Sequence, residues 1–116
     1  MPYLIMHGAS RFADFIRHVF GGEEIFVRMR DDNSTIMHAE VRISGCTIMY
    51  ADATADFGVS NANFFIYVEN ADASFEKALS QKCTVVMPLA NQDYGRSGGV
   101  KDPFGNTWWI TSVIEK

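Results

Sequence analysis

The stretch YGRSGGVKDPFGNTWWI, residues 94–110, predicts a closing β-hairpin around which the rest of the chain is arranged. Residues 98–102 are expected to form one strand, and residues 106–113, rich in aromatic and β-branched side chains, the returning strand. Asp102-Pro103-Phe104-Gly105 makes a tight turn, because proline presets φ at the second turn position and glycine tolerates a positive φ.

Two adjacent tryptophans in the returning strand, Trp108 and Trp109, should point to opposite faces of the sheet. We expect Trp108 to pack against covering helices and Trp109 to face the space on the other side, where a ligand would bind. Trp109 would there either stack on a planar ligand or simply fill the pocket, and the sequence does not separate these roles.

Outward from this hairpin, hydrophobic periodicity and turn residues predict the order β-α-β-β-β twice. The first half has expected strands at residues 3–7, 24–30, 35–43 and 46–51, with a helix that Ser10 caps and that ends at Gly21-Gly22. The second half has expected strands at residues 63–69, 84–89, 98–102 and 106–113, a helix capped by Asn70, and a polar loop at residues 90–97. We therefore predict a single α+β domain of two modules, residues 1–51 and 63–116, joined by a linker at residues 52–62.

Composition excludes several classes of protein. A chain of 116 residues with 47% hydrophobic and 21% charged residues is typical of one globular domain. The net charge of −4 gives no reason to expect nucleic acid, and no apolar run is long enough to span a membrane. The N-terminus lacks the pattern of a secretory signal, and Cys46 and Cys83 are expected as buried free thiols rather than a disulfide. These features favour a cytoplasmic protein.

Three motifs carry a resemblance to a known family: PYLIMHGASRFADFIRHVFGGEE (residues 2–24), HAEVRISGCTIMYAD (38–52) and YGRSGGVKDPFGNTWW (94–109). The chain resembles the vicinal oxygen chelate superfamily of glyoxalases, bleomycin-resistance proteins and dioxygenases, and within it the PhnB-like branch. That branch usually has an extra Asp before the arginine, whereas here Gly95 runs directly into Arg96. The resemblance implies a curved mixed sheet with helices on its outer face, a ligand in the concave face, and a homodimer.

The resemblance also implies a divalent metal held by inward-pointing His and Glu side chains, at which vicinal substrate oxygens would chelate. Alignment on the turns places the corresponding positions at Pro2, Met49, Asn63 and Trp109, none of which is His, Asp or Glu. A shift by one residue gives no better set. We therefore expect the family's cavity without its metal, lined instead by apolar and aromatic side chains.

Several polar and aromatic side chains are candidates for the cavity wall. His38 and Glu40 alternate with Met37, Ala39, Val41 and Ile43, the expected core face of the strand, and so share the other face. They form either an acid–base or polar pair at the cavity wall, or else a structural cross-strand polar network or a solvated face. Phe65 and Tyr67 share a strand face with Asn63, where they line the pocket or pack between the modules. Arg96, in the expected loop at the cavity mouth, either binds an anionic ligand or is an ordinary surface arginine.

These observations predict a small-molecule-binding protein, acting by sequestration or by a metal-free reaction whose catalytic residues the sequence does not reveal. The alternative is a metal-dependent glyoxalase-type lyase, isomerase or dioxygenase, and a third class is a pure interaction domain. The candidate ligand-binding residues are His38, Glu40, Met49, Asn63, Phe65, Tyr67, Arg96 and Trp109.

Overall fold

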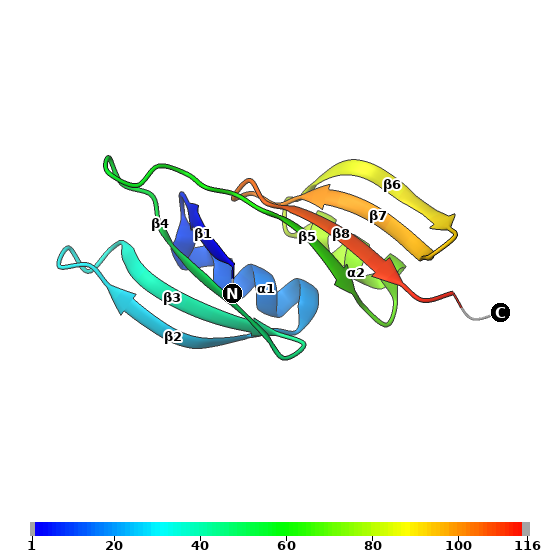
Figure 1. The fold of residues 1–116 in the computed structure, drawn as a ribbon, viewed down its shortest axis with the longest axis horizontal. Coiled ribbons are helices and arrows are strands. Elements are labelled where there is room, and N and C mark those ends of the chain that lie inside the picture. Colours follow the sequence, from blue (N-terminus) through cyan, green and yellow to red (C-terminus); the bar gives the residue numbers. More distant parts are fainter. Residues whose placement is uncertain (1, 115–116) are drawn as a thin grey trace. The chain divides into compact units, whose positions relative to one another are not determined.

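The computed structural model describes residues 2–114, which fall into two compact units with a boundary between residues 61 and 62 (Figure 1). Each unit contains a four-stranded mixed sheet and one α-helix, in the order β-α-β-β-β. The predicted α+β fold of two such modules is confirmed. No helix in the described part of the chain has the length and apolar character that a membrane span requires.

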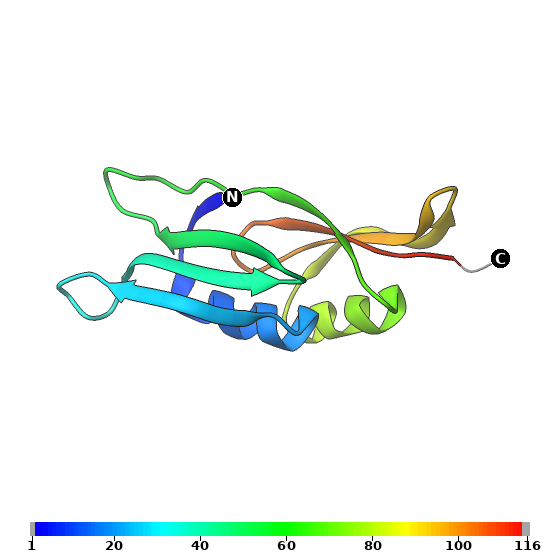
Figure 2. The same ribbon diagram turned by 60° about the horizontal axis from the view of Figure 1, so that its bottom comes forward.

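The N-terminal unit, residues 2–61, has its strands in the order β1-β4-β3-β2, with β1 parallel to β4 and the other pairs antiparallel. Its α-helix lies along one face of this sheet (Figure 2). The elements are β1 (Tyr3–Met6), a short 3-10 helix (Ala9–Arg11), α1 (Phe12–Phe20), β2 (Glu23–Met29), β3 (Ile36–Ile43) and β4 (Cys46–Asp52).

Helix α1 begins differently from the prediction, because Ser10 does not cap it. Ser10 lies within the 3-10 helix, and Arg11 at the N-cap makes no side-chain capping bond. A partner distant in sequence bonds the start of the 3-10 helix that precedes α1: Oδ1 of Asp52 accepts a hydrogen bond from the backbone N–H of Ala9 at 3.0 Å. The helix ends as expected, with Gly21 in the left-handed conformation at φ 68°.

Strand β3 buries a different set of residues from the predicted one at its start. Ala39, Val41 and Ile43 are buried as expected, but Ile36 is buried and Met37 is 43% exposed. The pairing of β2 with β3 shifts register between Arg28 and Met29, which reverses the alternation of side chains at that point. The backbone N–H of Ile36 donates to Oδ2 of Asp52 at 2.7 Å, so the carboxylate that bonds the start of the helices also holds this strand end.

The segment that follows β4 runs back along β1. Ser60 pairs with Ile5 through two backbone hydrogen bonds of 3.0 and 2.9 Å. Within the segment, Thr54 and Phe57 close a turn, in which the Thr54 N–H donates to the Phe57 carbonyl oxygen at 2.8 Å. Residues 53–61 therefore belong structurally to the N-terminal unit.

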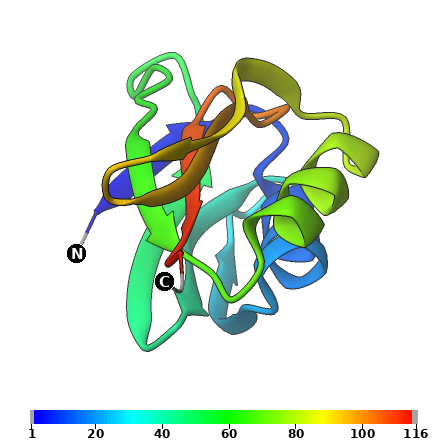
Figure 3. The same cartoon turned by 90° about the vertical axis from the view of Figure 1, so that its right-hand side faces the viewer.

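The C-terminal unit, residues 62–114, repeats the topology with strand order β5-β8-β7-β6 and with β5 parallel to β8 (Figure 3). Its helix contacts β6, β7 and β8. As predicted, Asn70 caps it, accepting from the N–H of Ala73 at 3.0 Å. The elements are β5 (Asn63–Tyr67), α2 (Ala71–Ser80), β6 (Thr84–Gln92), β7 (Gly95–Lys101) and β8 (Thr107–Ser112).

The loop predicted at residues 90–97 is mostly strand. Strand β6 continues to Gln92 and β7 begins at Gly95, so that only residues 93 and 94 form the turn. Asn91 pairs with Arg96 and Gln92 with Gly95 in a regular antiparallel register. The polar composition that suggested a loop belongs instead to the end of a two-stranded hairpin.

The closing hairpin is held by the side chain of Asp102. Its carboxylate accepts hydrogen bonds from the N–H groups of Phe104 and Asn106, at 2.9 and 2.8 Å, and from Nε1 of Trp108 at 2.8 Å. Burial raises the pKa of this carboxyl group, against the opposing effect of its hydrogen-bond donors. Gly105 has φ 98°, so the predicted turn with glycine at a positive φ is confirmed.

Candidate functional site

The sheet of the N-terminal unit has one face covered by α1 and one face that we call the N-terminal open face. Leu4, Met6, Ile48 and Tyr50 point to the α1 side and are buried, so their neighbours along the strands point the other way. The strand registers align Tyr3, Met49, Glu40 and Phe26 in one row across this open face. Met49 and Glu40, two of the predicted ligand-binding residues, therefore lie side by side on this face.

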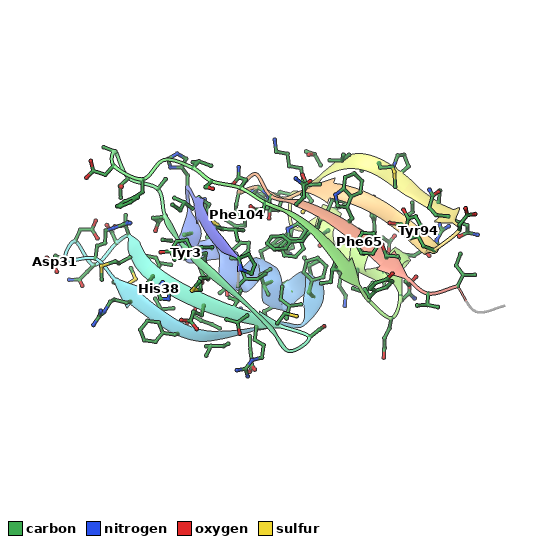
Figure 4. All side chains as sticks on the ribbon, in the orientation of Figure 1. Tyr3, Asp31, His38, Phe65, Tyr94 and Phe104 are labelled. Carbon is green, nitrogen blue, oxygen red and sulfur yellow. The ribbon has the colours of Figure 1, made fainter. Side chains whose placement is uncertain are left out.

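His38, which Figure 4 labels on β3, contacts Glu40 on the N-terminal open face. Nε2 of His38 lies 3.0 Å from Oε2 of Glu40, and both side chains are partly exposed. Because a carboxylate only accepts, Nε2 carries the hydrogen in this pair, and in the neutral ring Nδ1 is then an acceptor. The His38 ring lies 5.8 Å from that of Tyr3 and 5.9 Å from that of Phe26. The arrangement can orient a polar group of a ligand between two aromatic walls.

A pocket of about 570 Å³ lies in the same unit and shares Tyr3 with this group. Its apolar lining comes from β1, β3, β4 and the turn after β4, and its polar groups lie around that turn and the end of β4. The lining residues are Tyr3, Ile5, Arg30, Met37, Ala51, Asp52, Thr54, Asp56 and Phe57. A mostly apolar cavity of this size with a few polar groups is typical of small-molecule sites.

None of the nine lining residues is among the predicted ligand-binding residues, and Arg30 is one of those that the sequence did not single out. Its Nη2 donates to the backbone oxygen of Asp52 at 2.9 Å, whereas its Nη1 is buried and has no hydrogen-bond partner among the described residues. Nothing in the local pattern marks Arg30, since it follows β2 as one of several arginines. Tyr3 and Phe26, whose rings lie near His38, were also not among the predicted site residues. Strand alternation could have indicated Phe26, since it places this side chain on the opposite face from Ile25.

The C-terminal unit has a comparable open face, on the side of the sheet away from α2. Phe64 and Trp108 stack at 4.5 Å on the α2 side, so Asn63, Phe65, Tyr67 and Trp109 lie on the other side. The Phe65 ring lies 5.3 Å from that of Tyr67 and 5.9 Å from that of Tyr94. Four of the predicted ligand-binding residues therefore share one face of this sheet, and His38, Glu40 and Met49 share one face of the other.

Arg96 does not lie in a loop, as was predicted, but on β7. Gly98, two residues further along this strand, faces Phe75 of α2, so Arg96 points to the helix side of the sheet and away from Phe65 and Trp109. Its guanidinium forms a two-point pair with Asp72 in the first turn of α2, at 2.9 and 3.0 Å, and a third bond to Asn91 at 3.2 Å. The hydrogen bonds from Arg96 lower the pKa of Asp72. The polar partners of Arg96 are therefore structural.

The side chains present do not fit the divalent metal that the resemblance implied. In residues 2–114, no group of three or more His, Cys, Asp or Glu side chains is placed to hold a metal ion. His38 and Glu40 supply two potential ligands, but Met49 beside Glu40 is a thioether, a soft ligand unsuited to the harder divalent ions. We therefore assign no reaction step to a metal ion at this face.

Comparison with known proteins agrees with this architecture. Residues 5–110 match the model of the Glyoxalase/Bleomycin resistance protein/Dioxygenase superfamily. The uncharacterized protein Mb0911c of Mycobacterium bovis is 31% identical, aligned over 99% of this chain and 83% of its own length. The structure of a PhnB protein from Bacillus cereus is similar, with a TM-score of 0.79, 23% identity and coverage of 97% of this chain and 98% of that one. That of TnmS3, an antibiotic binding protein from Streptomyces, has a TM-score of 0.70 at 14% identity, covering 97% of this chain and 92% of that one.

Two β-α-β-β-β units, each with one sheet face left open, define a protein of the glyoxalase type. The chain belongs to the Glyoxalase/Bleomycin resistance protein/Dioxygenase superfamily. The PhnB structure, at 23% identity, shares the fold.

Proposed function

We propose that this protein binds a small organic molecule on its open sheet faces, without the family's metal. The observation that carries the proposal is the pocket of about 570 Å³ beside the His38–Glu40 pair. Its volume lies within the range of roughly 300–1,000 Å³ that is usual for ligand sites. Five of its lining side chains are apolar, and its polar groups are concentrated around Arg30 and the turn after β4. Such a site desolvates the body of a ligand and orients it by one end.

The aromatic side chains of the C-terminal open face support the same proposal. Phe65 and Tyr67 are 52% and 57% exposed, and Trp109 lies beside Phe65 in the strand register. Exposed aromatic rings on a sheet can stack on planar ligands. TnmS3, which shares the fold, is described as an antibiotic binding protein, so the fold is compatible with binding as the whole function. Binding would serve sequestration or a metal-free reaction.

The alternative is a metal-dependent lyase, isomerase or dioxygenase, which membership of the superfamily favours. Elemental analysis of the purified protein separates the two. Binding without the family metal predicts no stoichiometric zinc, nickel or iron after dialysis against a chelator. About one ion per chain, retained through that dialysis, would establish the alternative.

We further propose that the protein acts in the cytoplasm as a homodimer with a small-molecule ligand as its partner. Free thiols at Cys46 and Cys83 are typical of a reducing compartment. Phe26, Phe65 and Tyr67 are large exposed aromatic side chains on the sheets, which a second chain would cover in a dimer. Light scattering at micromolar concentration tests the dimer, and a monomer mass would contradict it.

The pocket itself is tested by a ligand screen with two matched variants. Compounds that raise the melting temperature of the wild type are titrated into Phe57→Ala and Val59→Ala. Both side chains are exposed and lie in the same segment, but only Phe57 lines the pocket. We expect Phe57→Ala to weaken binding and Val59→Ala to leave it unchanged. Equal affinities in both variants and the wild type would place the ligand elsewhere.

A further inference from the structure

The guanidinium of Arg30 is only partly used by the protein. Arg30 follows β2, and its backbone N–H donates to the oxygen of Thr35 at 2.8 Å, which fixes the start of the β2–β3 loop. Its side chain reaches to the end of β4, where Nη2 donates to the oxygen of Asp52 at 2.9 Å. That bond holds the planar group in one orientation, with Nη1 buried and without a partner in the described part of the chain.

A buried donor of a charged group is costly to leave unpaired. No carboxylate among the described residues lies within ion-pair distance of Arg30, whereas Arg17, Arg42 and Arg96 all have acidic partners. Arg30 lines the pocket, so an oxygen acceptor on a bound molecule can satisfy Nη1 without displacing a protein partner.

Two acidic residues also line the pocket, and their positions decide which ligand charge is favoured. Asp52 is buried, and each of its carboxylate oxygens already accepts a backbone N–H, from Ala9 at 3.0 Å and from Ile36 at 2.7 Å. These bonds offset part of its charge. Asp56 is exposed, so water screens it. Of the charged lining residues, Arg30 is the one with a buried hydrogen-bonding atom that has no partner in the described part of the chain.

The covering of Nη1 means that a ligand oxygen reaches it only after a lining side chain shifts. Met37 is suited to this movement because its side chain is unbranched and flexible and is 43% exposed. Phe57, which is 66% exposed, belongs to a turn rather than to the sheet. The remaining apolar lining, from Tyr3, Ile5 and Ala51, lies on the paired strands β1 and β4.

From these contacts we infer that the pocket selects a small organic carboxylate, whose apolar body lies against Met37 and Phe57 and whose carboxylate accepts from Nη1 of Arg30. The inference rests on the proposed binding function and adds the chemical class of the ligand and the residue that recognises it. A hydrogen bond to a charged group is stronger than a neutral one, so the carboxylate is preferred over a neutral carbonyl of the same shape.

The test compares two probes of the same size, 2-naphthoate and 2-acetylnaphthalene, at about pH 7, where the carboxyl group of the first is ionised. Dissociation constants are measured from the amide chemical shifts of residues lining the pocket. The variants are Arg30→Gln and the matched control Arg17→Gln. The control removes the same charge from α1, which covers the opposite face of the sheet and where Arg17 pairs with the exposed side chain of Asp14.

We expect wild type to bind naphthoate at least about tenfold more tightly than the neutral probe, as one charge-assisted hydrogen bond gives. In Arg30→Gln the two probes should bind with about equal affinity, whereas Arg17→Gln should retain the preference for naphthoate. If Arg30→Gln fails to fold, Arg30→Lys replaces it in the test. A lysine ammonium bonded to the Asp52 oxygen has no second nitrogen in the position of Nη1. The preference for naphthoate should therefore fall in this variant too.

The possible failures are distinct. If both probes shift the pocket residues equally in the wild type, or if Arg17→Gln lowers the preference as much as Arg30→Gln, the role of Arg30 is wrong and the pocket stands. If neither probe shifts those residues, the proposed binding function of the pocket fails, and the inference falls with it.

Discussion

The indole Nε1 of Trp108 donates a hydrogen bond to Oδ2 of Asp102 at 2.8 Å, and both side chains are buried. The bond joins the start of β8 to the turn that precedes it. The largest core side chain of the C-terminal unit and the closing turn therefore both depend on the Asp102 carboxylate. Trp109, the next residue, lies on the opposite face and is only partly buried. The two tryptophans should therefore respond differently to substitution.

Trp108→Ala should lower the free energy of unfolding by about 3–5 kcal/mol, the usual cost of removing a large buried aromatic side chain. The stacked partner Phe64 and the acceptor Oδ2 of Asp102 both lose contacts. Trp109→Ala should cost less, because its side chain already borders open space. Urea unfolding of both variants measures the difference. A larger loss for Trp109→Ala would show that the faces are assigned the wrong way round.

Gly99→Ala should displace the ring of Trp109. A Cβ atom at residue 99 would lie 2.6 Å from Cζ3 of Trp109, a distance at which one of the two must move. Because Gly99 and Trp109 are directly paired on β7 and β8, the ring has to rotate away from β7. We expect a shift in tryptophan fluorescence with a modest loss of stability.

The control for this substitution is Gly58→Ala, where an added Cβ meets no neighbouring atom. Its fluorescence should match that of the wild type. A Gly99→Ala spectrum identical to wild type would mean that the indole does not lie over Gly99.

The raised pKa of Asp102 predicts how its contribution to stability depends on pH. The folded state binds the proton more tightly than the unfolded chain, whose Asp has a pKa of about 3.9. The contribution is therefore fully present below that value and is lost as pH rises through the higher folded-state pKa. As pH rises through this interval, we expect the free energy of unfolding of the wild type to fall relative to that of Asp102→Asn. A pH-independent difference would contradict the raised pKa.

The two cysteines should react with thiol reagents at different rates. The sequence predicted both to be buried, but Cys46 is exposed at the start of β4, and Cys83 is buried with its pKa raised to about 12 by desolvation. Because the thiolate is the reactive form, Cys83 should be almost inert in the folded protein at neutral pH. Titration with a chromogenic disulfide should show one fast thiol, absent in Cys46→Ser, and a second only after unfolding in urea.

The sequence by itself determined the order of elements, the turn at Asp102–Gly105 and the opposition of Trp108 and Trp109. Each of these depends on interactions within a few residues: the alternation of side chains along a strand, the fixed φ of proline, the tolerance of glycine for positive φ. Asn70 as a helix cap was equally local, since it bonds Ala73 three residues on. His38 and Glu40 shared a strand face because they are two residues apart.

Only the tertiary structure decided the partners of residues far apart in the chain. Arg30 meets Asp52, Arg96 meets Asp72, and Asp52 bonds Ala9 in place of a local cap at Ser10, across separations of 22, 24 and 43 residues. Such contacts depend on how strands align across a sheet, and a single register shift near Met29 was enough to turn Met37 outward into the pocket lining. The conformational preferences of neighbouring residues do not indicate that alignment, because the packing of the whole unit sets it.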